Sequence, residues 1–261
     1  MTTLSGVPVS AHVQRDQSPG VPPLALTGER TLPDVPAENY WYRRHLAVYE
    51  WIGARVAGRR VLDMACGEGY GSEVLSRSAA SVLGVDANPE AFEHARLRYT
   101  RQNLSFERGL VDNHGEPGAY DAIVFLQTIE HVQDPVAVLE HFRALSAPGE
   151  TVYVSTPNVL TLAPAGAEKS DNPWHVREYR AHEFRALCSS VFAEVAMLGL
   201  FHARKLRIHE LALAAGWDAV HARLRITKPF YDRFTPAIAS SDFTLRPVGL
   251  DGALDFLAVC R

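Results

Sequence analysis

Short continuous apolar runs alternate along this 261-residue chain with stretches whose apolar residues recur at helical spacing. Runs of this kind have the length and composition of strands that are buried on both faces of a sheet. They lie at 60–63, 82–86, 104–107, 120–127, 151–157, 194–201, 242–245 and 255–260. The helical stretches between them predict an α/β fold with a doubly wound, parallel sheet.

Three ranges stand outside this alternation. Residues 1–26 are rich in Pro, Ser, Thr and Gly without a period, and we expect a flexible leader followed by one domain over 27–261. Within that domain, 158–180 and 202–237 each follow a predicted strand and break the pattern. Loops at the carboxyl ends of parallel strands carry ligand chemistry, so we expect two acceptor-side insertions.

A glycine-rich stretch follows the first strand, with Gly67, Gly69 and Gly71 behind an acid at Asp63. The second strand ends in another acid, Asp86. Glycines let the backbone lie against a ligand, and an acid after the second strand can bind ribose hydroxyls, so the unit predicts a nucleoside site. A tight turn in some other α/β protein is the alternative. The dinucleotide fingerprint is not met, because the sixth position from Gly67 is Ser72.

Composition narrows the classes of function. A net charge of −4 and a pI of about 6.3 give no reason to expect a nucleic-acid partner. Cys66, Cys188 and Cys260 have the spacing of neither a disulfide framework nor a zinc site. Without a signal peptide or a long apolar run, we expect a cytoplasmic protein with no membrane insertion.

The pattern Asp63-x-Ala65-x-Gly67-x-Gly69 resembles motif I of the class I S-adenosylmethionine-dependent methyltransferases, with Ala65 where a glycine is usual. Further motifs run from Thr27-Gly28-Glu29-Arg30-Thr31 through Ile129-Glu130-His131 to Asn172-Pro173-Trp174-His175. With them the chain is similar to the actinobacterial sugar O-methyltransferases, the group of the mycobacterial methylmannose polysaccharide 1-O-methyltransferase.

This resemblance implies a Rossmann-like sheet of seven strands, parallel except for one antiparallel strand near the C-terminus, with helical insertions. It implies S-adenosylmethionine as cofactor, with magnesium as a second candidate, and a small-molecule or oligosaccharide acceptor; the oligomeric state stays open, a homodimer included. Cofactor contacts are expected from Arg44, His45, Asp63, Ala65, Gly67, Gly69, Asp86, Ala87, Gly109, Leu110 and Gln127.

A titratable pair, Glu130 and His131, follows the fourth strand directly. A sugar hydroxyl needs a base to accept its proton, and we assign that role to His131, with Glu130 orienting it or the acceptor. A histidine that merely caps the turn is the alternative. Acceptor contacts are expected from Tyr40, Trp41, Asn172, His175 and Glu178.

The spacing of His175 and Glu178 could also serve a divalent cation, although such a pair alone does not identify a metal. Two other functions remain open at this point. One is methyl transfer to a different small hydroxylated or carboxylated metabolite. The other is a non-catalytic protein that binds the cofactor.

Overall fold

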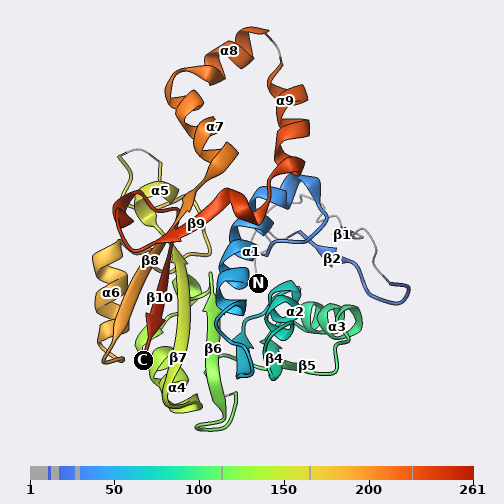
Figure 1. Ribbon diagram of the computed structural model, residues 1–261, viewed down its shortest axis with the longest axis vertical. Helices are drawn as coiled ribbons and strands as arrows, with labels where there is room; N and C mark the ends of the chain where they lie inside the picture. Colours follow the sequence, from blue (N-terminus) through green and yellow to red (C-terminus); the bar gives the residue numbers. More distant parts are fainter. Residues whose placement is uncertain (1–10, 13–17, 27–29, 113, 165, 225) are drawn as a thin grey trace.

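The computed structural model describes residues 11–12, 18–26, 30–112, 114–164, 166–224 and 226–261. Its largest feature is a sheet in the order β5-β4-β3-β6-β7-β10-β8-β9 (Figure 1). The strands are β3 (Arg60–Met64), β4 (Ser81–Asp86), β5 (Leu104–Arg108), β6 (Tyr120–Leu126), β7 (Ser146–Pro157), β8 (Val195–His202), β9 (Phe243–Arg246) and β10 (Asp255–Cys260).

The expected Rossmann-like class is confirmed, with one difference in the strands. Neighbours from β5 to β7 pair in parallel, whereas β10 is antiparallel to both β7 and β8. The described sheet has eight strands rather than seven, because the short run 243–246 pairs antiparallel with the edge of β8.

The strand order reverses between β3 and β6. The chain winds outward from β3 to β4 and β5, then returns to the other side of β3 as β6. Connections leave these two strands in opposite directions, which opens a crevice at their carboxyl ends. A ligand site is therefore expected where β3, β4 and β6 end.

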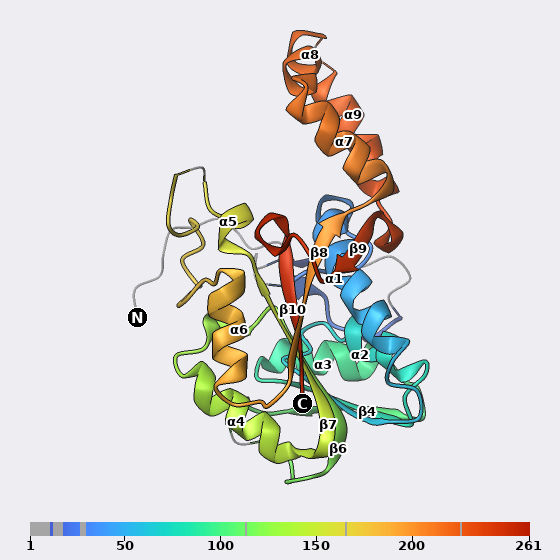
Figure 2. The same cartoon turned by 60° about the vertical axis from the view of Figure 1, so that its left-hand side comes forward.

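Helices cover both faces of the sheet (Figures 1 and 2). On one face lie α1 (Asn39–Gly53), α2 (Tyr70–Ser76) and α3 (Pro89–Arg98), and on the other α4 (Pro135–Leu145) and α6 (Ala181–Ser189). Two apolar clusters fill the spaces between, one centred on α1 and α2 and one on α4 and α6. Asn88 and Asp134 begin α3 and α4 as N-caps, each accepting backbone N–H groups of the first turn and each followed by proline.

Part of the expected leader is packed onto the domain. β1 (Ala11–His12) pairs with β2 (Leu24–Ala25), and Leu24 is fully buried with Leu32 and Val35. The imidazole Nδ1 of His94 on α3 donates to the Pro22 carbonyl at 2.7 Å. Residues 1–10 and 13–17 lie outside the described residues, so a flexible leader that ends at 26 stays a prediction.

The two expected insertions contain helices. In the first, α5 (Val159–Leu162) precedes an irregular loop. In the second, α7 (Arg204–Ala214), α8 (Trp217–Leu224) and α9 (Thr227–Phe234) project away from the sheet, and we call residues 204–234 the helical arm (Figure 2). Short 3-10 turns are η1 (Pro36–Glu38), η2 (Ile129–His131), η3 (Thr235–Ala237), η4 (Ser240–Asp242) and η5 (Leu250–Gly252). Among the described helices, none has the length and apolar content to cross a bilayer.

Candidate active site

The loop between β3 and α2 turns sharply at the carboxyl edge of the sheet, and we call Ala65–Gly71 the glycine loop. Ala65, Gly67 and Gly69 have positive φ angles of 59°, 58° and 96°. A Cβ added to Gly67 would meet no atom within 4 Å, whereas one on Gly69 would lie 2.8 Å from the Ala95 Cβ on α3. Gly67 therefore leaves room for a ligand, and Gly69 is required for packing.

Asp86 holds the glycine loop in place from the end of β4. Its Oδ2 accepts the N–H of Gly67 at 2.8 Å and its Oδ1 accepts the N–H of Asn88 at 2.8 Å. Each carboxylate oxygen has a further lone pair. Asp86 can therefore support the loop and still accept a hydrogen bond from a ligand hydroxyl.

Asp63, for which the sequence predicts a cofactor contact, lies beneath the glycine loop instead. Its carboxyl is fully buried and accepts the hydroxyls of Ser72 at 2.6 Å and Tyr49 at 3.2 Å. Burial raises the pKa of Asp63 to about 7. Because it lines none of the cavities described below, it positions α1 and α2 rather than touching a ligand.

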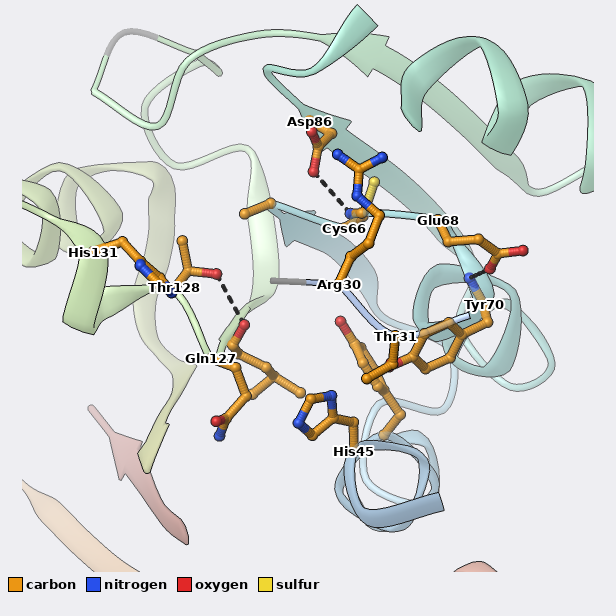
Figure 3. Close-up of a pocket in the computed structure, with 14 residues that line it drawn as sticks. Arg30, Thr31, His45, Cys66, Glu68, Tyr70, Asp86, Gln127, Thr128 and His131 are labelled. Carbon is orange, nitrogen blue, oxygen red and sulfur yellow. Dashed lines mark hydrogen bonds between the residues drawn. The ribbon is translucent and has the colours of Figure 1, made fainter. Parts of the chain in front are cut away.

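A cavity of about 290 Å³, the loop cavity, opens beside the glycine loop where β3, β4 and β6 end (Figure 3). Its lining residues are Arg30, Thr31, His45, Tyr49, Ala65, Cys66, Gly67, Glu68, Tyr70, Asp86, Leu126, Gln127, Thr128 and His131. Five of the expected cofactor residues are among them. Ala87, Gly109 and Leu110 are not, and their contacts stay predictions; the Gly109 N–H donates to the Asp86 carbonyl at 3.2 Å, beside the cavity wall.

Arg44 is not available to a ligand, which corrects the sequence-based expectation. Its Nε and Nη2 donate to Asp255 at 2.6 and 2.5 Å, and Nη2 also donates to the Leu254 carbonyl at 2.8 Å. Both side chains of the ion pair are buried. Asp255 lies 211 positions away in the sequence, so no local pattern could reveal this partner.

His45 does line the loop cavity, but not as a cation. Burial lowers its pKa to about 4, and the nearby Arg44 guanidinium contributes in the same direction. At neutral pH the imidazole is therefore uncharged, and it can offer a ligand a hydrogen bond but no net charge.

Arg30 is a site residue that sequence reasoning missed. It lines the loop cavity and makes no ion pair with any described residue. Figure 3 shows its guanidinium pointing toward Asp86. The only signal was its place in the motif Thr27–Thr31, of which Thr27, Gly28 and Glu29 lie outside the described residues.

A second cavity of about 340 Å³, the histidine cavity, adjoins the first. Its lining residues are Arg30, Thr31, Glu38, Trp41, His45, Gln127, Glu130, His131, Pro157, Leu162, Asn172 and His175. Trp41, Asn172 and His175, three of the expected acceptor contacts, are brought together here. Since Arg30, Thr31, His45, Gln127 and His131 line both cavities, the two share a wall.

Two histidines in the histidine cavity are held in defined orientations. The Trp174 carbonyl can only accept, so the His131 Nδ1 at 3.0 Å is the protonated nitrogen, and Nε2 of the neutral ring carries a lone pair. His175 Nδ1 lies 2.6 Å from a Glu178 carboxylate oxygen, while Asn172 donates to its Nε2 at 3.0 Å. Glu178 thus orients His175 and does not itself line the cavity.

Glu130 is buried in the η2 turn after β6, and the Trp174 carbonyl rather than the Glu130 carboxyl is the group bonded to His131 Nδ1. Thr156 donates its hydroxyl to Oε2 at 3.1 Å, and burial raises the pKa of the carboxyl to about 8. The Glu130 backbone carbonyl accepts the N–H groups of Val176 at 2.9 Å and Arg177 at 3.1 Å. These two bonds attach the acceptor-side loop to the η2 turn that carries His131.

Glu130, His131 and His175 place potential metal-ligating atoms within 4.8 Å of one another. Two imidazoles and one carboxylate are donors typical of zinc, iron and related transition metals, whereas magnesium prefers oxygen ligands. The donor set of this cluster therefore fits a transition-metal ion better than the magnesium that the resemblance implies.

Tyr40, another expected acceptor contact, lies elsewhere. It lines a third cavity of about 360 Å³, the arm cavity, together with His202, Leu206, His209, Glu210, Leu213, Tyr231, Phe234, Thr235 and Ile238. The Tyr40 hydroxyl is hydrogen-bonded to His202 Nε2 at 2.8 Å. Its side chain points to the base of the helical arm, because α1 places residues 40 and 41 on different sides of the helix.

Comparison with known proteins agrees with this geometry. Residues 40–211 match the model of a family described as a methyltransferase domain. A probable S-adenosylmethionine-dependent methyltransferase of Mycobacterium tuberculosis (strain ATCC 25618 / H37Rv) is 36% identical over 254 residues, covering 93% of this chain and 90% of the relative.

Two further similarities are more limited. A ubiquinone biosynthesis O-methyltransferase of Xanthomonas campestris pv. campestris (strain B100) is 36% identical over 129 residues, covering 46% of this chain and 54% of the relative. A solved structure from Thermotoga maritima, described as a possible histamine N-methyltransferase, superposes with a TM-score of 0.58 at 14% identity. It covers 86% of this chain and 94% of the solved chain, and it shows the fold alone.

Proposed function

Since this chain belongs to the S-adenosylmethionine-dependent methyltransferases, we propose that it methylates a sugar hydroxyl of a mannoside or related oligosaccharide. The observation that carries the proposal is the shared wall: His131 lines both the loop cavity and the histidine cavity. A group in this position can touch an acceptor at the point where the acceptor meets the cofactor.

The cofactor is expected in the loop cavity. Gly67 leaves open space beside its backbone, and Asp86 has lone pairs for the ribose hydroxyls. With Arg44 paired to Asp255, Arg30 remains as a cation on the wall of the loop cavity, where it can contact the bound cofactor. His45 and Gln127 contribute neutral polar contacts.

The reaction needs alignment and a proton acceptor more than it needs activation of the methyl group. Bound S-adenosylmethionine supplies a methyl group on a positively charged sulfur. A bond forms between the acceptor oxygen and the methyl carbon while the carbon–sulfur bond breaks, its electron pair staying on sulfur. His131 Nε2, which carries the lone pair, takes the hydroxyl proton. Holding the acceptor in line supplies the remaining acceleration.

The lining of the histidine cavity suits a polyhydroxyl acceptor. Asn172 and Thr31 offer hydrogen-bonding groups, and Trp41, with 41% of its surface exposed, offers an aromatic face. The partial similarity to a ubiquinone biosynthesis O-methyltransferase supports oxygen as the methylated atom.

His131→Ala tests the base assignment. Turnover should fall by about 10²- to 10⁴-fold, the usual contribution of a general base, while binding of S-adenosylhomocysteine measured by calorimetry stays nearly constant. Asn172→Ala is the matched comparison: it removes a polar group of the same cavity that has no route to the proton, so it should raise KM for the acceptor more than it lowers kcat. Unchanged turnover in the His131 variant would discard the assignment.

The acceptor class is tested with a panel of short mannosides, glycolipid precursors, phenols and small carboxylates. Turnover confined to mannosides or related oligosaccharides supports the proposal. Methylation only of the other compounds favours a different small metabolite. Binding of S-adenosylhomocysteine without turnover on any acceptor indicates a non-catalytic cofactor-binding protein.

We further propose that Glu130, His131 and His175 can hold a divalent cation, which would lower the pKa of a bound hydroxyl. An ion on His131 Nε2 would take the lone pair that the base needs, so the two roles exclude each other. Turnover that survives EDTA favours the base; turnover that EDTA abolishes and added zinc or manganese restores favours the cation.

A further inference from the structure

The helical arm exposes an unusual concentration of large apolar side chains. Of the fifteen such side chains exposed among the described residues, seven lie between 208 and 226. They are Ile208, Leu211, Leu213, Trp217, Val220, Leu224 and Ile226. A concentration of exposed apolar side chains on one segment is a candidate contact surface for another molecule.

The core of the arm is small and consists mainly of aromatic rings, with His221 packed against Trp217 and Phe230. The three helices of the arm are 11, 8 and 8 residues long, and the side chains that they bury, among the described residues, are those of Leu206 and His221. Both ring nitrogens of His221 lack a hydrogen-bond partner within the described structure. Helices this short are marginal unless packing supports them, so a surface that covers the exposed apolar side chains would add to the support that the aromatic rings give.

The exposed residues follow helical spacing and are flanked by arginines. Ile208 (70% exposed) lies four residues after Arg204 on α7, and Val220 (40% exposed) lies three residues before Arg223 on α8. Side chains at these spacings are neighbours on a helix. Neither arginine makes an ion pair with a described residue, so both charges are free for a partner.

The charge of the arm identifies the kind of partner. Residues 204–234 hold seven basic and three acidic residues, a net charge of +4 in a chain whose net charge is −4. Two arms would repel each other, which disfavours arm-to-arm pairing of two copies. Exposed apolar residues beside arginines are the composition of helices that lie in the interface of an anionic bilayer.

We propose that the helical arm docks this enzyme on the surface of a bilayer that contains anionic lipids. Ile208, Leu211, Val220 and Leu224 enter the boundary between headgroups and acyl chains, and Arg204 and Arg223 contact lipid phosphates. The arm projects away from the sheet (Figure 2), so docking leaves the histidine cavity and the loop cavity on the body of the enzyme.

Vesicle sedimentation of the full chain tests the proposal, with phosphatidylcholine alone compared with an equal mixture of phosphatidylcholine and phosphatidylglycerol. Binding is expected only to the mixture and should weaken as salt rises. Arg204→Gln with Arg223→Gln should lower the partition coefficient roughly thirtyfold, since each basic residue near the surface contributes about a factor of five.

Ile208→Glu with Leu224→Glu should lower partition by at least as much. Val248→Glu is the matched control, because Val248 is 66% exposed but lies outside the arm, and its partition should not change. Undiminished binding of S-adenosylhomocysteine shows that each variant is folded.

Three results would overturn the proposal. One is wild-type protein that does not sediment with the mixed vesicles. Another is equal partition of the Ile208/Leu224 variant and the wild type. The third is a dimer in vesicle-free solution that dissociates in the Ile208/Leu224 variant, which would assign this face to a second copy of the chain.

Discussion

Replacing Ala65 by glycine tests whether the glycine loop stores backbone strain. Ala65 has φ = 59°, in the left-handed region that costs a residue with a Cβ about 1–2 kcal/mol. Glycine removes that cost, but it also stabilises the unfolded chain by about 0.4–1 kcal/mol, because the unfolded chain has more conformational freedom with glycine than with alanine. Ala65→Gly should therefore stabilise the fold by about 0.5–1 kcal/mol.

For a chain of this size 1 kcal/mol corresponds to about 2–4 °C in Tm, so an increase of about 1–4 °C is expected. Thermal unfolding of the cofactor-free protein measures it. Gly67→Ala is the opposite change at nearly the same φ, 58°, and should lower Tm by a similar amount. The methyl group that Gly67→Ala adds would occupy the open space beside the loop cavity where the ligand is expected. Affinity for S-adenosylhomocysteine should therefore fall about tenfold or more, a loss of about 1.4 kcal/mol in binding free energy.

A lower Tm for Ala65→Gly would refute the assigned strain, because the left-handed conformation would then carry no strain that glycine relieves. Binding of S-adenosylhomocysteine by Gly67→Ala as tightly as by the wild type would contradict the expected loss of affinity, because the space beside Gly67 would then not be where the ligand lies.

Three further predictions concern charged side chains in and beneath the site. Arg44→Met should lower the free energy of unfolding in urea by about 3–5 kcal/mol, since it leaves Asp255 buried and unpaired. The cofactor affinity of the folded fraction should not change. A loss of affinity without a loss of stability would show that Arg44 does contact the cofactor. Arg30→Met should weaken cofactor binding measured by calorimetry and change the stability of the fold little. Cofactor affinity equal to that of the wild type would exclude Arg30 from the site. In the folded protein the pKa of Asp63 is raised to about 7, so the folded state binds a proton more readily than the unfolded state. The stability that this proton contributes is full below the unfolded pKa near 4 and is lost as pH rises through 7. Asp63→Asn should flatten this dependence of unfolding free energy on pH between pH 4 and pH 8, and an unaltered slope would contradict the assignment.

The sheet and the glycine loop could be predicted because their signals are local. Apolar runs of strand length, the glycines and Asp86 lie within short windows of sequence, and the structure brings Gly67 and Asp86 together at 2.8 Å. The apolar run at 242–245 predicted the edge strand that the structure places at Phe243–Arg246, whereas the family resemblance implied only seven strands.

The site residues that sequence placed wrongly depend on distant partners. The charge of Arg44 suggested a contact with the cofactor, but Asp255 on the last strand pairs with this charge instead. Motif position suggested that Asp63 faces the ligand, but it is turned toward Ser72 and Tyr49. A side chain's type can be taken from sequence, whereas the direction in which it points is set by tertiary packing.

The attachment of Val176 and Arg177 to the Glu130 carbonyl has a consequence for changing specificity. These bonds fasten one end of the acceptor-side insertion to the same short turn that carries His131, so the proton acceptor and that part of the wall keep a fixed separation. Residues 159–164 of the insertion, of which Leu162 lines the histidine cavity, make no bond to the Glu130 carbonyl. Exchanging that segment should let an engineer retarget the enzyme to new acceptors while its catalytic step runs at the original rate.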